Sequence, residues 1–458
     1  MMKMKNTLLT AQSVGTIHNK LAGSYVVRSF ISTMSNTDNV NLFYPFKSKM
    51  QLYQWFVGFS DAESNFIIHR ILDKKGNISK FSFMFNIELH IDDLHVLEFI
   101  KNKLEIGNIR VYKDKSIFTV SDKQGVYKLM SIFDEFNLNT TKRMDYLNFK
   151  EAFILYHERD SNVKVTESKE LIGKILKYKN TMNTKRNLAL LTPEDLESNI
   201  NITSYWLLGF IEGDGSFFIS RTDIEPVFYI ELSEEQYPVL LKIKEYLENN
   251  LGFDKYSLYK LKSSSVISIN KQKSRLGKPT VIFSIKNIFI LNNYFIPFIE
   301  NMVFISKKGK DFLYFKIICN AVYKGSHKLE YIRSLIIKLS YTMNNFRLST
   351  NTKPVELLSE QEKDNIILAE ATFEYLNDGR ILDKKTNKPL ASFRSCIYEV
   401  TLPSGEIVLV DTLKEALGMV NVSFRTLKKL LDEGQSVKLR SYEVKRVPIF
   451  LPLDKFKI

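Results

Sequence analysis

Trp55-Phe-Val-Gly-Phe-Ser-Asp-Ala-Glu-Ser-Asn-Phe66 has a second copy in this chain, Trp206-Leu-Leu-Gly-Phe-Ile-Glu-Gly-Asp-Gly-Ser-Phe217. The 458 residues include two tryptophans, and each of them opens one copy. Both copies are apolar runs that end in acidic residues. The repeat predicts two equivalent helices at corresponding places in a duplicated fold.

Each copy carries two small residues four positions apart, Gly58 and Ala62 in the first and Gly209 and Gly213 in the second. At helical spacing the two small residues of a copy share one face. Two such helices can therefore approach each other almost backbone to backbone. We expect these four residues to form a helix–helix interface.

Each copy also ends in two carboxylates, Asp61 and Glu63 or Glu212 and Asp214. If the helices pack side by side in the same direction, Glu63 and Asp214 meet at their C-terminal ends, where the helix dipoles are already negative. Protonation of one carboxylate relieves this repulsion, and so does a divalent metal such as magnesium, which prefers oxygen ligands. A metal held there would suit phosphodiester cleavage. The alternative is a pair of buried helices whose acids are solvated.

Both stretches resemble the LAGLIDADG motif, and the chain resembles the single-chain, two-motif LAGLIDADG homing endonucleases and intron maturases. The resemblance implies an α+β fold, a duplicated αββαββα saddle with the motif helices between the halves. It implies that Glu63 and Asp214 are catalytic acids and metal ligands, with backbone carbonyls of Ala62 and Gly213 as further metal ligands. Ser64 stands where the motif has glycine, and we expect it to leave the helix at some strain.

The composition is that of a soluble globular protein with a basic excess. Its 65 basic and 51 acidic residues give a net charge of +14 and a pI of about 9.3, which suggests a polyanionic partner such as nucleic acid. Basic charge also fits a membrane-surface or ribosome-associated protein. No apolar run is long enough to span a bilayer, and two cysteines are too few for a disulfide framework and lack zinc-ligand spacing.

The repeat and the composition predict six segments. In chain order they are a basic leader at 1–45, a first half at 46–183, a linker at 184–203, a second half at 204–350, a linker at 351–390 and a C-terminal nucleic-acid-binding module at 391–458. The leader is typical of an organellar transit peptide, of a disordered arm, or of the remnant of a fused upstream reading frame. Abundant Asn, Ile, Lys, Phe and Tyr hint at an organellar genome, so we expect a mitochondrial protein.

The clearest strand pattern is Phe81–His90, in which apolar and polar residues alternate almost without exception. One face of this strand would pack on helices, and the other would meet water or the base edges of a DNA major groove. The candidates for nucleic-acid contact in the two halves are Ser82, Asn86, Glu88, His90, Arg70 and Arg221.

A basic stretch precedes a helix late in each half, and it contributes Lys142 or Lys308. The resemblance implies that each half places a basic residue near the scissile phosphates, where it stabilises negative charge in the transition state. The alternative is a solvated lysine at a helix start. Thr181-Met-Asn183 and Thr342-Met-Asn344 then close the halves, so the duplication spans roughly 50–350.

Beyond 390 the pattern changes to a hairpin at Tyr398–Val410, followed by a helix from Thr412 and a second helix from Ser423 to Leu431. This order predicts a helix-turn-helix-like domain and resembles the small modular domains appended to homing nucleases. An ordinary helical hairpin is the alternative. Candidate contacts with nucleic acid in this domain are Arg425, Lys428 and Lys429.

Together these features favour a monomeric, magnesium-dependent homing endonuclease. As in the resembling family, it would cut a long asymmetric double-stranded DNA target, leave 3′ overhangs and promote group I intron mobility. One alternative is an RNA maturase that binds its host intron and assists splicing. Another is an organellar nucleoprotein component that has lost catalysis. Retention of both motif acids favours the endonuclease, because a pure RNA binder has no need to sustain their repulsion.

Overall fold

The computed structural model describes residues 44–159, 168–186, 199–273, 277–390, 395–420, 422–433, 436–439 and 441–451. From Ser48 onward the chain forms one compact unit. Residues 1–43 of the predicted leader and most of the predicted linker at 184–203 lie outside the described residues. Within the described part, no helix is long and apolar enough to cross a membrane.

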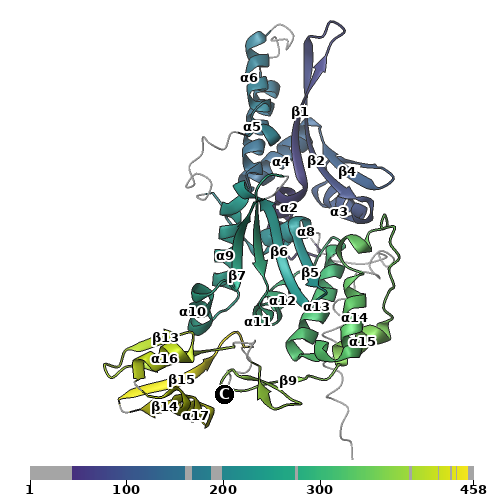
Figure 1. Cartoon of the computed structure of the whole chain (residues 1–458). Helices are drawn as coiled ribbons and strands as arrows, with labels where there is room; N and C mark the ends of the chain where they lie inside the picture. The colour runs from purple at the N-terminus through teal and green to yellow at the C-terminus, as the bar shows by residue number, and fades with distance from the viewer. Residues whose placement is uncertain are drawn as a thin grey trace, which may run out of the picture. The chain divides into compact units, whose positions relative to one another are not determined.

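The first half contains one four-stranded sheet and the helices that cover it (Figure 1). Its elements are α2 (Lys49–Glu63), β1 (Ser64–Leu72), β2 (Ile78–His90), the 3-10 turn η2 (Ile91–Asp93), α3 (Leu94–Leu104), β3 (Asn108–Val111), β4 (Lys115–Val120), α4 (Lys123–Glu135), α5 (Lys142–His157), α6 (Lys169–Lys179) and η4 (Asn183–Lys185). The strand order is β1-β2-β4-β3, and all neighbours are antiparallel.

The second half repeats this topology with the strand order β5-β6-β8-β7. Its elements are α8 (Ser204–Asp214), β5 (Gly215–Ser220), β6 (Glu225–Ser233), η6 (Glu234–Gln236), α9 (Tyr237–Asn250), α10 (Lys255–Ser263), β7 (Ile267–Gln272), β8 (Thr280–Ile285), α11 (Ile288–Ile290), the π-helical turn η7 (Leu291–Phe295), α12 (Ile296–Glu300), α13 (Lys308–Lys324), η8 (Ser326–Lys328), α14 (Glu330–Ser340) and η9 (Asn344–Arg347). Helix α10 occupies the place of the short connection between α3 and β3.

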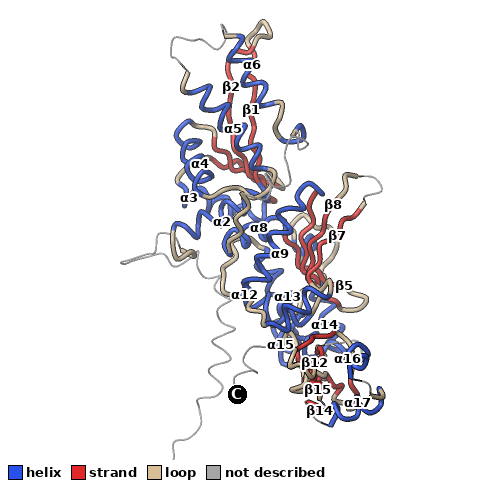
Figure 2. Tube along the Cα trace, turned by 90° about the vertical axis from the view of Figure 1, so that its left-hand side faces the viewer, coloured by secondary structure: helices blue, strands red, loops and turns tan. Residues whose placement is uncertain are grey.

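The alternation at Phe81–His90 forms strand β2 and buries one of its faces. Phe81, Phe83, Phe85 and Ile87 are buried, and the residues between them are half-buried or exposed. Because successive side chains of a strand point to opposite faces, this pattern leaves a second, polar face that the helices do not cover. Figure 2 shows helices α3, α4 and α5 gathered around the strands of this half.

The two motif stretches form α2 and α8, which lie side by side in both views (Figures 1 and 2). Each helix starts at a hydroxyl cap. Ser48 accepts a hydrogen bond from the Gln51 backbone N–H, and Thr203 accepts one from the Trp206 backbone N–H. Such caps satisfy amide groups that the first helical turn leaves without an internal partner.

The prediction that 351–390 is a linker is wrong. This range holds α15 (Glu360–Leu368) and a three-stranded sheet of β9 (Phe373–Tyr375), β10 (Ile381–Asp383) and β11 (Lys388–Pro389). Ile366, Phe373 and Ile381 are buried, and α15 packs on α13 and α14. These elements are too short for their periodicity to stand out in the sequence. Their packing on the second half, through α15 on α13 and α14 and Phe373 against His327, appears only in the folded chain.

The C-terminal region has the element order ββααββ and consists of two layers, a four-stranded sheet and a pair of helices. It consists of β12 (Cys396–Thr401), β13 (Ile407–Val410), α16 (Leu413–Val420), α17 (Phe424–Glu433), β14 (Ser436–Leu439) and β15 (Tyr442–Pro448), with the sheet order β13-β12-β15-β14. The predicted hairpin and both helices are present, but a helix-turn-helix domain is not confirmed. Leu427 and Leu431 of α17 pack on Val400 and Val444 of the sheet. The helices therefore form one layer over a sheet that joins the predicted hairpin to β14 and β15, two strands that the sequence pattern missed.

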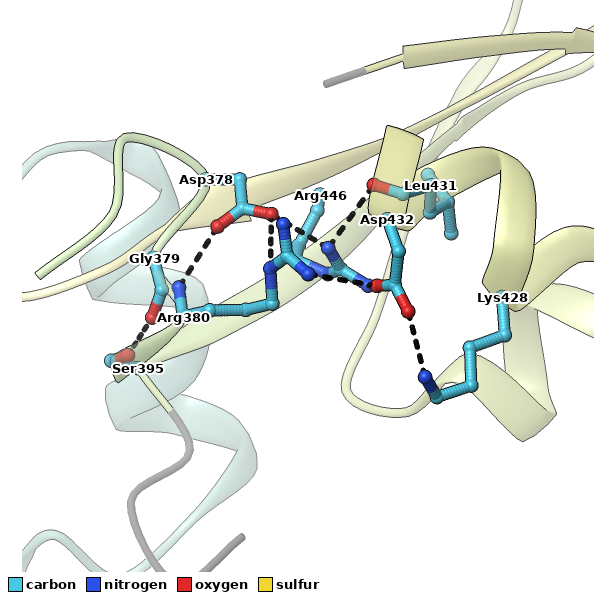
Figure 3. Close-up of polar contacts among 8 residues, drawn as sticks. All are labelled: Asp378, Gly379, Arg380, Ser395, Lys428, Leu431, Asp432 and Arg446. Atoms are coloured by element: carbon cyan, nitrogen blue, oxygen red, sulfur yellow. Dashed lines mark hydrogen bonds and ion pairs between the residues drawn. The ribbon is translucent and has the colours of Figure 1, made fainter. Parts of the chain in front are cut away.

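Buried polar contacts attach this region to the preceding β9–β10 turn. Arg446 donates to Asp378 at 2.6 Å, to Asp432 at 2.9 Å and to the Leu431 carbonyl oxygen at 3.3 Å (Figure 3). Asp378 also pairs with Arg380 at 2.7 Å. Because Asp378 follows β9 whereas Asp432 ends α17, one arginine joins two segments of the chain.

Candidate active site

The two motif helices touch through their backbones at the small residues. A Cβ atom at Gly58 would lie 2.0 Å from the Trp206 carbonyl oxygen, and one at Gly209 would lie 2.1 Å from the Trp55 carbonyl oxygen. A Cβ at Gly213 would lie 2.2 Å from the Cβ of Ala62. The structure therefore brings all four predicted small residues into the interface, where larger side chains would force the helices apart.

Each tryptophan donates a hydrogen bond to an acid of the other helix. Trp55 Nε1 donates to Glu212 Oε1 at 2.8 Å, and Trp206 Nε1 donates to Asp61 Oδ2 at 2.9 Å. All four side chains are buried. Burial raises the pKa of Asp61 and of Glu212, and the hydrogen bonds that they accept oppose this rise. The first acid of each motif is thus a structural group within the interface.

Asp61 and Glu212 also hold the turns that precede two further helices. Asp61 accepts from the Asn139 N–H at 2.7 Å, the Thr140 N–H at 3.1 Å and the Thr140 hydroxyl at 2.6 Å. Glu212 accepts from the Ile305 N–H at 3.0 Å and the Ser306 N–H at 2.5 Å. These turns lead directly into α5 and α13, which begin at the two predicted basic residues.

The ammonium groups of Lys142 and Lys308 lie at the C-terminal ends of the motif helices. Lys142 Nζ donates to the carbonyl oxygens of Ser60 at 3.0 Å and Ala62 at 3.2 Å. Lys308 Nζ donates to the carbonyl oxygens of Ile211 at 3.1 Å, Gly213 at 2.6 Å and Gly215 at 2.6 Å. Each lysine therefore donates to carbonyl oxygens at the last turn of its motif helix, and its charge opposes the negative end of the helix dipole.

Glu63 and Asp214 lie at the same ends of these helices and share one electrostatic environment. Burial and the Asp214 carboxylate raise the pKa of Glu63 to about 7, against the opposing effect of Lys308 and Lys142. Burial likewise raises the pKa of Asp214, and the same two lysines oppose it. Two carboxylates and two ammonium groups thus meet at one place, contributed equally by the two halves.

The donor set at this place suits a divalent cation. Among the described residues, no group of three or more His, Cys, Asp or Glu side chains could hold a metal ion. Glu63 and Asp214 are the two carboxylates at this place that would act as side-chain ligands. The carbonyls of Ala62 and Gly213, predicted as further ligands, each accept a hydrogen bond from a lysine. Hard oxygen donors completed by water are typical of magnesium, and a cation would favour the ionised form of Glu63.

Ser64 leaves helix α2 without the strain expected from the sequence. Its backbone is in the extended region, with φ −92° and ψ 164°, and Gly215 at the equivalent position has φ −72° and ψ 149°. Neither conformation requires glycine. The Ser64 hydroxyl donates to the Ser60 carbonyl oxygen at 2.6 Å, so the side chain adds a hydrogen bond at the helix end.

Of the predicted nucleic-acid contacts on the first sheet, Ser82, Asn86, Glu88 and His90 lie on the face that the helices leave open. Glu88 pairs with Lys115 at 3.0 Å. His90 Nε2 lies 3.0 Å from the Thr350 hydroxyl of the second half. These two side chains therefore already have partners within the protein.

Arg70 and Arg221 are placed differently from the prediction. Arg70 pairs with Phe81 and lies on the opposite face of the sheet, whereas its neighbour His69 pairs with Ser82 on the open face. Arg221 donates to the Ser340 hydroxyl at 2.8 Å and to the Ser340 carbonyl at 3.1 Å, and its guanidinium lies over the Tyr341 ring at 4.0 Å. Arg221 thus caps the C-terminal end of α14 and does not lie on the open face of a sheet.

The predicted cations of the C-terminal region all lie on the exposed side of α17. Arg425, Lys428 and Lys429 are exposed. Lys428 pairs with Asp432 at 2.7 Å and Lys429 with Glu433 at 3.8 Å, each along the same helix. These ion pairs reduce the positive charge that this helix presents.

Sequence reasoning missed the paired role of the tryptophans and the first motif acids. It also named no strand residue of the second sheet, whose open face carries Ser216, Tyr229, Glu231, Ser268, Asn270 and Thr280. The sequence did signal the tryptophan–acid pairs, because tryptophan and acid recur in register in both copies. It signals the strand residues of the second sheet more weakly, since apolar and polar residues alternate less regularly in β6 and β7 than in β2.

Comparison with known proteins gives the family. A family model described as LAGLIDADG endonuclease matches residues 56–153 and 207–319. The chain is 31% identical over 300 residues to the probable intron-encoded endonuclease Cox1-I1b of Schizosaccharomyces pombe. The aligned region covers 64% of this chain and 70% of that protein. The chain belongs to the LAGLIDADG endonuclease family. The uncharacterized mitochondrial protein RF1 of Saccharomyces cerevisiae is 25% identical over 409 residues, 86% of this chain and 81% of that protein.

Solved structures of the LAGLIDADG family share the fold. The homing endonuclease I-GzeII in complex with its DNA target matches with a TM-score of 0.52 at 23% identity, over 64% of this chain and 99% of that chain. The homing endonuclease I-LtrWI bound to target DNA matches with a TM-score of 0.53 at 23% identity, over 65% and 99%. The predicted α+β fold with two repeated LAGLIDADG halves is confirmed.

Proposed function

We propose that this LAGLIDADG protein is a site-specific homing endonuclease that hydrolyses both strands of double-stranded DNA with a divalent metal, such as Mg²⁺. The observation that carries the proposal is the backbone contact of α2 and α8, which brings the ends that carry Glu63 and Asp214 together, with Lys142 and Lys308 bound to carbonyl oxygens of the same helix ends. A charge of +14 supports a polyanionic substrate. Relatives named as endonucleases, and structural neighbours determined with DNA, support the same activity.

In this mechanism Glu63 and Asp214 would hold the metal, which supplies a polarised water and stabilises charge at the phosphate. The protein's own residues position the reacting groups. Lys142 and Lys308 would place one ammonium group near each scissile phosphate, where it stabilises the extra negative charge of the transition state. The backbone contact of α2 and α8 fixes the two acids relative to each other, so the two cuts would lie a short distance apart. If they lie across the minor groove, as the family resemblance implies, they would leave 3′ overhangs.

The DNA target should be asymmetric because the open sheet faces differ between the halves. Equivalent rows across the two sheets, read in strand order, are Asn65-Asn86-Thr119-Asn108 and Ser216-Tyr229-Ser284-Ser268. In the second row Ser284 is buried and hydrogen-bonded to Ser268, which leaves Ser216 and Tyr229 as the more accessible groups. Different hydrogen-bonding groups read different base edges. Since one chain supplies both halves, a monomer suffices for both cuts.

The biological role that we propose is mobility of a group I intron in mitochondria. One relative is named as intron-encoded and another as mitochondrial, and the composition of the whole chain agrees with an organellar origin. The alternative role is that of a maturase that binds the host intron RNA. RNA binding alone does not depend on ionised Glu63 and Asp214, because it involves no cleavage.

Cleavage of the intronless exon junction tests the proposal. The purified full chain is incubated with supercoiled plasmid carrying that junction, with Mg²⁺ or with EDTA, and the ends are mapped by sequencing. We expect Mg²⁺-dependent linear product with 3′ overhangs, and a loss of roughly 100-fold or more in Glu63→Gln and Asp214→Asn, since each removes a charged group that acts at the reacting phosphate. Tight binding to the intron RNA without cleavage would instead favour the maturase.

A further inference from the structure

Each lysine-bearing turn is held by a side chain from the opposite half. In the first half this turn ends at Thr141, directly before Lys142. Gln236 of the second half accepts a hydrogen bond from the Thr141 N–H at 3.1 Å and donates to the Thr141 hydroxyl at 2.5 Å. Gln236 is the last residue of η6, the 3-10 turn that leads into α9.

The reciprocal contact holds the second lysine. Asp93, the last residue of η2, accepts from the Lys307 N–H at 2.8 Å. Its neighbour Asp92 accepts from the Ser349 N–H at 2.7 Å and lies 3.7 Å from Lys307 Nζ. The equivalent 3-10 turns η6 and η2 therefore each hold the lysine-bearing turn of the opposite half. The acceptor is the amide oxygen of Gln236 in one case and the carboxylate oxygen of Asp93 in the other.

These contacts occupy the place of a helix cap. Thr141 and Lys307 are the N-cap residues of α5 and α13, and neither makes a side-chain capping hydrogen bond of its own. The Lys142 and Lys308 N–H groups donate to the neighbouring Thr140 and Ser306 hydroxyls. The turn before each helix is held in addition from outside, by the internal acid of its own motif helix and by the 3-10 turn of the other half. Lys142 and Lys308 are the next residues along the chain, so the position of each Nζ depends on where that turn lies.

We propose that Gln236 and Asp93 are positioning residues that act across the two halves, Gln236 on Lys142 and Asp93 on Lys308. The inference rests on the proposed nuclease function and deepens it. Each half then completes the lysine site of its partner, so the cut made at one acid–lysine pair depends on a residue of the other half. Loss of one contact affects mainly one strand of the DNA.

Strand-resolved cleavage tests this assignment. Gln236→Leu and Asp93→Leu remove the acceptors, Gln236→Glu and Asp93→Asn keep an acceptor oxygen, and Gln124→Leu on the exposed side of α4 is the control for the substitution itself. The target duplex carries a different fluorophore on each strand, and single-turnover rates are measured. Each leucine variant should slow one strand by up to roughly tenfold, the size of one lost hydrogen bond, with opposite strands affected in the two variants. The Gln236→Glu and Asp93→Asn variants should recover most of the rate.

Equal slowing of both strands, or unchanged rates in folded leucine variants, would overturn the proposal. Amine footprinting gives a second readout that requires no cleavage. The DNA-free proteins are pulsed with acetic anhydride, and acetylation at Lys142 and Lys308 is quantified by peptide mass spectrometry. Gln236→Leu should raise labelling at Lys142 several-fold without changing Lys308, and Asp93→Leu should do the reverse. If the wild-type chain cuts no DNA, the nuclease proposal fails, and the footprint still decides whether the cross-half positioning exists; unchanged or unselective labelling refutes it.

Discussion

Asp61 and Glu63 are separated by one residue, yet the protein uses them differently. Asp61 is 4% exposed and accepts hydrogen bonds from Trp206 and the turn before α5. Glu63 lies at the helix end, where its main electrostatic neighbours are the Asp214 carboxylate and the two lysines. At the residue scale, the partners of a carboxylate decide whether it holds the fold together or is available for chemistry.

The backbone contact at Gly58 makes a sharp prediction. Gly58→Ala places a methyl group against the Trp206 carbonyl oxygen, which cannot move without separating the helices, so we expect a loss of about 3 kcal/mol or more in the free energy of unfolding. Gly173→Ala is the matched control, since a Cβ there meets no atom within 4 Å. It should stabilise the mid-helix position by about 0.5–1 kcal/mol. Urea unfolding measures both, and equal effects of the two variants would contradict the backbone contact.

His327 predicts a specific pH dependence of stability. Burial is the main cause that lowers its pKa from 6.5 to about 4, with Lys328 and Arg333 acting in the same direction. The unfolded chain therefore binds a proton at higher pH than the folded chain, and stability falls as the pH drops from 6.5 to about 4. The expected loss from this group is at most about 3 kcal/mol.

Unfolding free energies of wild type and His327→Gln, measured between pH 7 and 4, test this prediction. The wild type should lose more stability than the variant over this interval, because only the wild type carries the titrating ring. Parallel pH profiles would show that the ring is not buried in its neutral form.

At the element scale, the two halves differ in how far their first hairpin extends. Strands β1 and β2 have 9 and 13 residues, whereas β5 and β6 have 6 and 9. The longer hairpin carries Lys74, Lys75 and Lys80, which are all exposed. A basic arm of this kind is suited to the phosphate backbone flanking one side of an asymmetric target.

The triple variant Lys74→Ala, Lys75→Ala, Lys80→Ala tests that function. If each lysine neutralises one phosphate, the slope of log Kd against log salt should become shallower by about 2 to 3, since each contact contributes about 0.9. The corresponding Lys→Arg triple keeps the charge and should keep the slope. Fluorescence anisotropy with the target duplex measures both, and an unchanged slope in the alanine variant would place the DNA elsewhere.

Helix α10 is the second difference between the halves. It has no equivalent among the described residues of the first half, and it contacts the C-terminal region, where Tyr256 donates to Glu399 at 2.6 Å and Lys260 donates to Asp411 at 2.9 Å. Asn293 of η7 adds a hydrogen bond to the Phe450 carbonyl oxygen at 2.7 Å. An insertion in one half thus supplies a docking surface for the C-terminal region.

At the scale of the whole molecule, the buried Arg446 network predicts that the C-terminal region is an integral part of the fold. Arg446→Met removes the more buried of the two arginines that pair with Asp378 and Asp432, and leaves both acids paired with Arg380 (Figure 3). Breaking a buried ion pair by removing one partner costs about 3–5 kcal/mol, and because Arg380 remains we expect the lower end of this range. Lys428→Met is the matched control, because it breaks only an exposed pair with Asp432 within one helix, worth less than about 1 kcal/mol.

Limited proteolysis and thermal unfolding of these two variants distinguish the cases. Arg446→Met should open the segment between β9 and β15 to protease, whereas Lys428→Met should behave as wild type. Equal resistance of both variants would show that the network does not hold this region in place.

The sequence alone predicted the motif helices, their glycine contacts, the alternating strand β2 and the duplicated order of elements. Each of these is encoded locally, by residue spacing within one helix or strand and by its repetition about 150 residues later. The pairing of Glu63 with Asp214 follows from the same repeat, because equivalent helices that touch at equivalent glycines must bring equivalent ends together. The repeat by itself therefore determines which two acids meet.

The tertiary structure decided which of these residues have partners, and where they lie. The bonds of Trp206 with Asp61 and of Gln236 with Thr141 join residues 145 and 95 positions apart, so no local pattern signals them. Arg221 has the charge of a DNA contact and became a cap for α14, and residues 351–390 have the composition of a linker and became a helix and a sheet. In each case the outcome depends on a surface that exists only after distant segments have packed, and sequence periodicity carries no information about that surface.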